Sequence, residues 1–322
     1  MSFVRDLLEL ARTHQCVSAD DHASYLASLD PYSRPFVISM LKDAKRYERV
    51  HELLTSMGLE PIRFNAITGS AVRGHRVLKG FDRLKDGELG CLASHLCILA
   101  LASTHPSSEQ FTLIFEDDVT SSLRGDALLE NLARASEVAD REGASLLHLG
   151  KCFETCGQMT HVEGNIYRSY KPYCAHAIAV RNGVAEGYTL FMRKKGAAVD
   201  NLYMYRMLSG EVRGLAFHPA LFYQDVLRTS SNIRPGMINS YNECIDTRDC
   251  ETCQEPQPCP SPSPPACPTP DPARDVLVTK QRTQHDAGVA LTVVLLAIAI
   301  AVAVCLEARS RRRQAARRRR LF

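Results

Sequence analysis

The sequence lacks several features that define whole classes of protein. Its N-terminus, MSFVRDLLELARTHQ, has no apolar core of the kind that a secretory signal peptide requires. No Asn-x-Ser/Thr sequon occurs anywhere in the chain. Apolar residues are not scarce, because 45% of the residues are hydrophobic and 23% are charged. This composition excludes a disordered, collagen-like or disulfide-miniprotein character for the bulk of the chain.

The net charge of the 322-residue chain averages two regions of opposite sign. The sequence has 39 basic and 36 acidic residues, a formal charge of +3. Residues 307–322 contain eight Arg and one Glu, so residues 1–306 carry 31 basic and 35 acidic side chains, a net charge of −4. A mildly acidic body is not typical of nucleic-acid-binding proteins, so we expect no nucleic acid among its partners.

Proline and cysteine are concentrated in one segment. Five of the 12 cysteines lie between Cys244 and Cys267, and the Pro-rich stretch 246–286 is predicted to be a stalk. Proline at this density precludes a helix or a central strand and favours an extended spacer. The cysteines could form disulfides, a zinc site or acylation sites. Cys250-x-x-Cys253 resembles half of a zinc site, but no second CxxC or His pair follows, which disfavours zinc.

One long apolar run follows the stalk. Residues 287–306 contain no charged side chain over 20 positions, the length that a helix needs to cross about 30 Å of hydrocarbon. We therefore predict a C-terminal single transmembrane helix at 287–306, with a lipid bilayer as partner and an Arg-rich tail at 307–322. The alternative is a buried core helix, but such helices rarely run this long without a polar face.

Two orientations in the membrane stay open. The positive-inside rule places the Arg-rich tail in the cytosol and the body in a lumen, where Cys244–Cys267 could pair. Insertion as a tail anchor would instead leave the body in the cytosol. The missing signal peptide and the missing sequons marginally favour a single-pass membrane protein with a cytosolic body.

Residues 1–245 carry the pattern of a folded domain. An amphipathic stretch that ends at two prolines indicates that 1–35 is an N-terminal appendage. Within 36–245, short apolar runs alternate with helical periodicities, which predicts an α/β sheet flanked by helices. The expected strands are 36–40, 62–64, 111–115, 145–149, 175–180 and 212–217, and the expected helices are 46–57, 89–101, 124–140, 183–192 and 200–208.

Three consecutive carboxylates follow one of the expected strands. Glu116, Asp117 and Asp118 come directly after the apolar run 111–115, and strand ends in an α/β sheet face the ligand crevice. Adjacent acids repel one another unless a cation lies among them, and a hard divalent ion with oxygen ligands is the natural partner. The alternative is a solvated acidic turn after an edge strand.

The expected helix 89–101 presents a second polar group. Glu88 and His95 are seven residues apart, which places them within about 20° of the same helix face. Small residues lie near that face, and an opposing stripe of leucines is expected to be buried. The histidine is either a catalyst or a buried structural residue.

Six sequence blocks span about 36–225: FVISMLKDAKRYERV, RFNAITG, GELGCLASHLCIL, LIFEDDV, AVDNLYMYRM and PALFYQD. In this order, they resemble glycosyltransferase family 25. The family comprises lipooligosaccharide β-galactosyltransferases and procollagen galactosyltransferase-like proteins. The resemblance implies a GT-A-like fold with a nucleotide-binding sheet, a UDP-sugar donor and Mn²⁺ as the divalent cation.

The resemblance also implies a donor and metal site. Arg46 matches a helix start near the nucleotide, and Gln224 matches a glutamine that follows the late P-x-L block. Glu116, Asp117 and Asp118 match the family's E-D-D, the counterpart of the DxD motif that holds metal and donor diphosphate. It follows that Asp117 and Asp118 are the expected metal ligands. Arg46, Glu116, Asp117 and Gln224 are the expected donor-binding residues.

Three further matches are the candidate catalytic residues. Glu88 and His95 match the family's G-E-[IL]-G-C-x-x-S-H helix, and Asp200 matches the Asp of its P-[VI]-D block. Inverting glycosyl transfer needs a carboxylate that deprotonates the acceptor hydroxyl, and we assign this role to Asp200. Asp200 also lies at an expected helix start, so a capping role is the alternative.

The sequence therefore predicts a membrane-anchored glycosyltransferase that moves a hexose, galactose or glucose, from a UDP-sugar to a glycan or protein acceptor. The reaction is expected to be metal-assisted and inverting. The alternative is a membrane-bound scaffold that keeps the fold without turnover, although its site would tend to lose acids that this chain retains. A third hypothesis gives the function to the Arg-rich tail as a nucleic-acid or anionic-lipid patch, but Arg beside a membrane span usually determines orientation.

Overall fold

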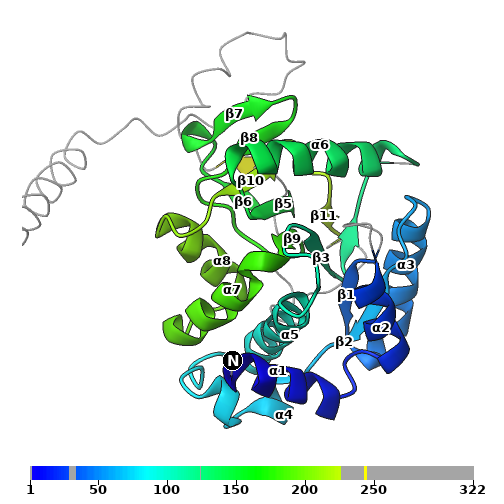
Figure 1. The fold of residues 1–322 in the computed structure, drawn as a ribbon, viewed down its shortest axis with the longest axis vertical. Coiled ribbons are helices and arrows are strands. Elements are labelled where there is room, and N and C mark those ends of the chain that lie inside the picture. The colour runs from blue at the N-terminus through cyan, green and yellow to red at the C-terminus, as the bar shows by residue number, and fades with distance from the viewer. Residues whose placement is uncertain (1, 29–33, 124, 226–242, 245–322) are drawn as a thin grey trace, which may run out of the picture. The chain divides into compact units, whose positions relative to one another are not determined.

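A mixed sheet of eight strands organises the fold (Figure 1). The structure is a computed structural model and describes residues 2–28, 34–123, 125–225 and 243–244. The sheet strands are β1 (Phe36–Ser39), β2 (Ile62–Asn65), β3 (Phe111–Glu116), β5 (Leu146–Gly150), β7 (Thr160–Glu163), β8 (Ile166–Arg168), β9 (Ala177–Arg181) and β10 (Gly214–Phe217). They lie in the order β2-β1-β3-β9-β5-β10-β8-β7.

The strand directions decide where the loops of the sheet gather. β1 pairs in parallel with β2 and β3, and β10 pairs in parallel with β5. β9 runs antiparallel between β3 and β5, so those two strands point the same way. The carboxyl ends of β1, β2, β3, β5 and β10 therefore lie at one edge, which is the edge where α/β sheets bind ligands. All the expected strands are confirmed, with small shifts at their ends.

Two short strand pairs lie outside this sheet. β4 (Val119–Thr120) pairs antiparallel with β11 (Tyr223–Gln224), and β6 (Phe153–Glu154) pairs in parallel with β12 (Glu243–Cys244). The sequence did not predict them, because two residues are too few to display an alternating pattern. The first pair places Gln224 opposite Val119 and therefore beside the E-D-D segment.

Helices cover both faces of the sheet (Figure 1). They are α1 (Ser2–Thr13), α2 (Ala19–Ala27), α3 (Ala44–Thr55), α4 (Gly69–Val72), α5 (Asp86–Ala102), α6 (Ala127–Glu142), α7 (Asn182–Lys195) and α8 (Val199–Leu208). The expected helices correspond to α3, α5, α6, α7 and α8.

Alternation along the strands sorts the core into two layers. Phe36 and Ile38 of β1 belong to the apolar cluster that contains α1, α5, α7 and α8. Val37, between them, faces the other way and packs in the cluster that contains α3 and α6. A period of two places successive side chains on opposite faces of a strand, so both faces of this sheet are covered. The α/β fold class is confirmed.

Helix α5 is buried on almost every side. The expected stripe of leucines is buried, but so are all other residues from Leu89 to Ala102 except Cys91, which is half-buried. The prediction of one buried face was too narrow, because α1, α4, α7 and α8 all pack around this helix. A helix that is apolar all round belongs in a core.

The N-terminal segment packs into the domain and is not an appendage. Leu7 is fully buried and Leu10 is 4% exposed, and both belong to the same apolar cluster as α5. The Cys97 thiol of α5 also lies 3.4 Å from the carbonyl oxygen of Leu7. The amphipathic pattern of α1 was therefore a sign of packing against the body rather than of a separate unit.

The predicted stalk, apolar run and Arg-rich tail all fall within 246–322, outside the described residues. Among the residues that are described, no helix has both the length and the apolar character to cross a bilayer. The C-terminal transmembrane helix accordingly stays a prediction.

Candidate active site

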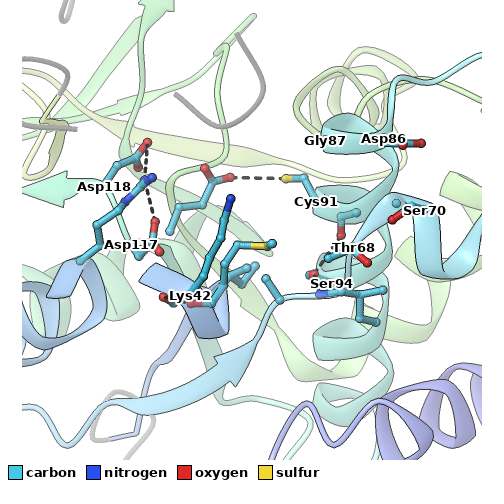
Figure 2. A pocket seen from close by; sticks show the side chains of 18 of the residues that line it. Lys42, Thr68, Ser70, Asp86, Gly87, Cys91, Ser94, Asp117 and Asp118 are labelled. Atoms are coloured by element: carbon cyan, nitrogen blue, oxygen red, sulfur yellow. Dashed lines mark hydrogen bonds and ion pairs between the residues drawn. The ribbon is translucent and has the colours of Figure 1, made fainter. Parts of the chain in front are cut away.

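A pocket opens at the carboxyl ends of β1 and β3 (Figure 2). Its volume is about 290 Å³. Residues of the segment after β2 and of the first turns of α5 complete its wall. The polar residues that line it are Ser39, Lys42, Arg46, Thr68, Ser70, Asp86, Cys91, Ser94, Glu116, Asp117, Asp118 and Gln224. The pocket thus brings together every residue that the sequence assigned to donor and metal binding.

The E-D-D segment forms the turn at the end of β3. Glu116 is the last residue of that strand, and Asp117 and Asp118 occupy the turn before β4. An Arg46 guanidinium nitrogen lies 2.6 Å from Asp117 Oδ1 and 3.7 Å from Asp118 Oδ2. The Gln224 amide nitrogen donates to Asp118 Oδ2 at 3.4 Å. The alternative of a solvated acidic turn is excluded, because Asp117 is 5% exposed and Asp118 is 9% exposed.

Burial and mutual repulsion raise the pKa values of both aspartates. Burial raises the pKa of Asp118 most, Glu116 and Asp117 raise it further, and Arg46 only partly offsets them, so the pKa is about 7. Burial also raises the pKa of Asp117, and this effect exceeds the lowering by Arg46 and Ser39. The single guanidinium therefore does not compensate the negative charge of this turn.

The remaining oxygens of these aspartates fit a hard divalent cation. Asp117 Oδ2 and Asp118 Oδ1 are buried and have no hydrogen-bond partner among the described residues. An unpartnered buried carboxylate oxygen is costly, and oxygen ligands are those that Mn²⁺ and Mg²⁺ prefer. The donor set of the turn therefore suits the cation that the family resemblance implies.

His95 contacts this site from behind its wall. The imidazole is fully buried and does not line the pocket, but its Nε2 lies 3.7 Å from Glu116 Oε1. Burial raises the pKa of Glu116, yet the interactions with His95 and then with His176 outweigh burial, so its pKa lies below the usual range. Cys91 Sγ, one helical turn before His95, lies 3.6 Å from the same carboxylate oxygen. Glu116 is therefore held ionised between two side chains of the helix core.

Glu88 lies at the start of α5 and outside the pocket lining. Its Oε2 accepts a hydrogen bond from the backbone nitrogen of Lys85 at 3.1 Å, the contact that the third helical residue makes in a capping box. Its contact explains why a glutamate suits this helix start, where four backbone amides need partners and the dipole favours negative charge. Glu88 and His95 thus share a helix but have different surroundings.

Asp200 also lies outside the pocket lining, in the first turn of α8. The N-cap of that helix is Ala198, so Asp200 does not cap it, although its Oδ1 accepts from the backbone nitrogen of Asn201 at 2.8 Å. Burial, Glu116 and then Asp200 raise the pKa of Cys91 well above its usual value. This influence places Asp200 within electrostatic range of the pocket wall.

Two features of the site had no signal that we recognised in the sequence. Lys42 lines the pocket and extends into it (Figure 2), although it lies in an exposed turn four residues before Arg46. Cys152 and Cys174 form a disulfide at the same edge of the sheet. The spacing of four residues between Lys42 and Arg46 could have indicated that the two cationic side chains lie close together. The disulfide, in contrast, depends on two loops that meet in space.

Comparison with known proteins agrees with these observations. Residues 33–160 match the family model described as glycosyltransferase family 25 (LPS biosynthesis protein). None of the curated proteins matches the chain. The matched region includes β1, Arg46, α5 and the E-D-D turn, and it contains every residue of the pocket lining except Gln224. Residues 33–160 are thus similar to glycosyltransferase family 25, and this similarity supports the transfer of a sugar from a donor to an acceptor as the activity of the chain.

Proposed function

We propose that this protein is a membrane-anchored, metal-dependent hexosyltransferase. It moves galactose or glucose from a UDP-sugar to a hydroxyl of a glycan or protein acceptor, with inversion at the anomeric carbon. The observation that carries the proposal is the E-D-D turn with its two unpartnered, buried aspartate oxygens, beside Arg46 in a pocket at the strand ends. An inactive scaffold would gain nothing from such an arrangement, because buried unsatisfied carboxylates cost stability.

The residues around the pocket suit a nucleoside diphosphate. Asp117 and Asp118 would hold a divalent cation such as Mn²⁺, which when bound neutralises charge on the departing diphosphate. Lys42 and Arg46 are cationic side chains of the same lining, and they can bind phosphate oxygens directly. Gln224 positions the Asp118 carboxylate through its amide. The volume of about 290 Å³ is close to the lower end, about 300 Å³, of known small-molecule sites.

The acceptor hydroxyl needs a base, for which Asp200 is our candidate. Its charge acts on Cys91 of the pocket wall, although its Oδ1 also accepts from the backbone nitrogen of Asn201. Glu88 accepts a backbone hydrogen bond at the start of α5 in the same way, and His95 is fully buried. Among the three candidate catalytic residues, Asp200 therefore fits best with a group that accepts a proton from a substrate at the pocket.

Calorimetry with UDP-galactose and UDP-glucose tests the donor and the metal. We expect binding of one of them in the presence of Mn²⁺ and loss of that binding when EDTA removes the metal. The Asp86→Asn variant should keep this metal-dependent binding, because Asp86 lines the same pocket but its Oδ1 already accepts from Arg73 Nε at 2.9 Å. Tight binding that is indifferent to EDTA would contradict the metal role of Asp117 and Asp118.

The Asp200→Asn variant tests the base. It should lower the transfer rate by on the order of 10²–10⁴-fold, the usual contribution of a general base, and leave donor affinity unchanged. The measurements are donor affinity and transfer rate on the same preparation. An unchanged transfer rate would remove Asp200 from the mechanism and redirect attention to Glu88 and His95.

The apolar run 287–306 would anchor the protein in a bilayer, and 246–286 would hold the catalytic body away from it. Fractionation of cells that express the full chain or residues 1–245 tests this anchor, which fails if both forms distribute alike. The cytosolic placement of the body stays a prediction. The Cys152–Cys174 disulfide supports the lumenal alternative, because disulfides persist in oxidising compartments.

A further inference from the structure

Cys91, His95 and Glu116 form a cluster whose three ligand atoms lie within 4.8 Å of one another. Cys91 and His95 are four residues apart on α5 and so share one face of the helix. Glu116 reaches them from the end of β3, with its Oε1 at 3.6 Å from Cys91 Sγ and 3.7 Å from His95 Nε2. A helix and the strand that follows it therefore present a sulfur, a nitrogen and an oxygen to one point.

The separations match those of ligands around zinc. Tetrahedral Zn²⁺ holds sulfur at about 2.3 Å and nitrogen or oxygen at about 2.0–2.1 Å, which separates sulfur from a nitrogen or oxygen ligand by about 3.5–3.6 Å and nitrogen from oxygen by about 3.3–3.4 Å. The 3.6 Å between Cys91 Sγ and Glu116 Oε1 agrees with the first separation, and the 3.7 Å between His95 Nε2 and Glu116 Oε1 exceeds the second by only a few tenths of an ångström. Small side-chain rotations would therefore close the cluster around a metal ion.

The orientation of His95 is a second and independent observation. Its side chain is fully buried, and Nε2 has no hydrogen-bond partner among the described residues. Nδ1, on the other side of the ring, lies 3.3 Å from the Tyr203 hydroxyl. A histidine that ligates a metal ordinarily has its other ring nitrogen oriented by such a partner. A buried ring nitrogen is thus directed at a carboxylate oxygen that it does not reach by hydrogen bonding.

We propose that Cys91, His95 and Glu116 bind a thiophilic divalent cation, Zn²⁺, with one coordination position open to the pocket. Cys91 and Glu116 line the pocket whereas His95 closes the site from behind, so the open position faces the cavity. Three protein ligands with a fourth position for water or substrate is the usual form of a catalytic zinc site. The site differs in kind from the Asp117–Asp118 pair, whose oxygens select harder ions such as Mn²⁺.

Cobalt spectroscopy on the full chain in detergent, without sugar nucleotide or reductant, tests this site. Omitting the reductant keeps the Cys152–Cys174 disulfide closed, so those sulfurs do not bind metal. A Cys250→Ser/Cys253→Ser background removes the CxxC of the predicted stalk. We expect a thiolate-to-cobalt absorption in the near ultraviolet that saturates at about one Co²⁺ per chain, and displacement of this Co²⁺ by Zn²⁺ but not by Mn²⁺.

Three variants decide the outcome. Cys91→Ser should abolish the absorption and weaken Zn²⁺ binding by on the order of 100-fold or more, because loss of even an indirect supporting group costs about 10–100-fold. Cys97→Ser, a buried free cysteine on the same helix, is the matched control and should behave like the parent. Glu116→Gln should also weaken Zn²⁺ binding, and it decides the case if Cys91→Ser does not fold.

The proposal is overturned if the parent binds no Co²⁺ or if Cys91→Ser and Glu116→Gln keep its stoichiometry and affinity. The cluster would then be a hydrogen-bonded contact between α5 and β3 alone. No donor enters this assay, so the zinc site and the transferase proposal stand or fall separately.

Discussion

Glu154 and Asp118 are both buried carboxylates near the same edge of the central sheet, but their oxygens have very different partners. Glu154 is 1% exposed and accepts from the Ser169 hydroxyl and from the Lys171 backbone nitrogen, each at 2.7 Å. The Lys151 ammonium lies 3.5 Å away. Asp118 is 9% exposed, and its Oδ1 has no hydrogen-bond partner among the described residues.

The contrast separates a carboxylate that supports the fold from one that is available to a ligand. Burial of a charge is tolerated when hydrogen bonds and an opposite charge replace water, as they do at Glu154. At Asp118, hydrogen bonds and an opposite charge replace water only in part, and burial and neighbouring acids raise its pKa to about 7. A bound cation would compensate the negative charge at Asp118, whereas Glu154 needs no such ion.

The largest effect is expected from removing the satisfied carboxylate. Glu154→Ala should lower the free energy of unfolding by about 3–5 kcal/mol, because it leaves a buried ammonium without its partner. The pKa of Lys151 is already lowered, mainly by burial, and Glu154 opposes that shift. Chemical denaturation of variant and parent measures the difference. Donor affinity of the remaining folded protein should not change.

Glu163→Gln is the matched control for that variant. Glu163 pairs with Arg141 at 2.6 Å, but their side chains are 46% and 55% exposed. Exposed pairs contribute about 0–1 kcal/mol, so this variant should stay close to the parent. Equal losses for Glu154→Ala and Glu163→Gln would contradict the structural role assigned to Glu154.

A smaller effect, on donor affinity rather than on stability, is expected from Asp118→Asn. Metal-dependent donor affinity should fall by on the order of 10–100-fold, since one metal-binding oxygen is lost. The free energy of unfolding at pH 8 should be equal to that of the parent or higher, because the amide buries no charge. Calorimetry and denaturation together measure both quantities. A variant that lost stability as Glu154→Ala does would remove the distinction between the two sites.

The smallest expected effect is a pH dependence of stability in the metal-free protein. The raised pKa keeps Asp118 protonated in the folded state up to about pH 7, whereas the unfolded chain releases this proton near pH 4. The folded state therefore binds more protons in that window, and this contribution to stability decreases as pH rises, by on the order of 1 kcal/mol between pH 6 and pH 8.

Other groups titrate in the same range, so the useful quantity is the parent minus the Asp118→Asn variant. The pKa of His176, for example, is lowered by burial to about 4. Denaturation at several pH values should show this difference decreasing as pH rises, and the decrease should become smaller when Mn²⁺ is added to the parent. A difference that is flat with pH would show that Asp118 is ionised throughout.

Local sequence was sufficient for the elements that carry the site. Five apolar-leaning residues before Glu116 predicted β3, and the strand end located the acidic turn, because a buried strand is recognised from its own residues. The helical spacing likewise placed Glu88 and His95 on α5. It did not separate their roles, since one residue lies at the helix end and the other within the core.

Residues that are distant in the chain could be brought together only by the tertiary structure. Gln224 reaches Asp118 over a sequence separation of 106 because β11 pairs with β4. The Cys152–Cys174 disulfide likewise depends on two loops that meet at the sheet edge, and the contact between Cys91 and Glu116 depends on how α5 packs beside the end of β3.

The sequence by itself thus determined the order of the main strands and helices, the acids at a strand end and the resemblance to a family, because hydrophobic periodicity and short motifs are local properties. Only the tertiary structure decided which of those acids are partnered. That outcome depends on burial and on contacts across the sheet, which no local pattern records.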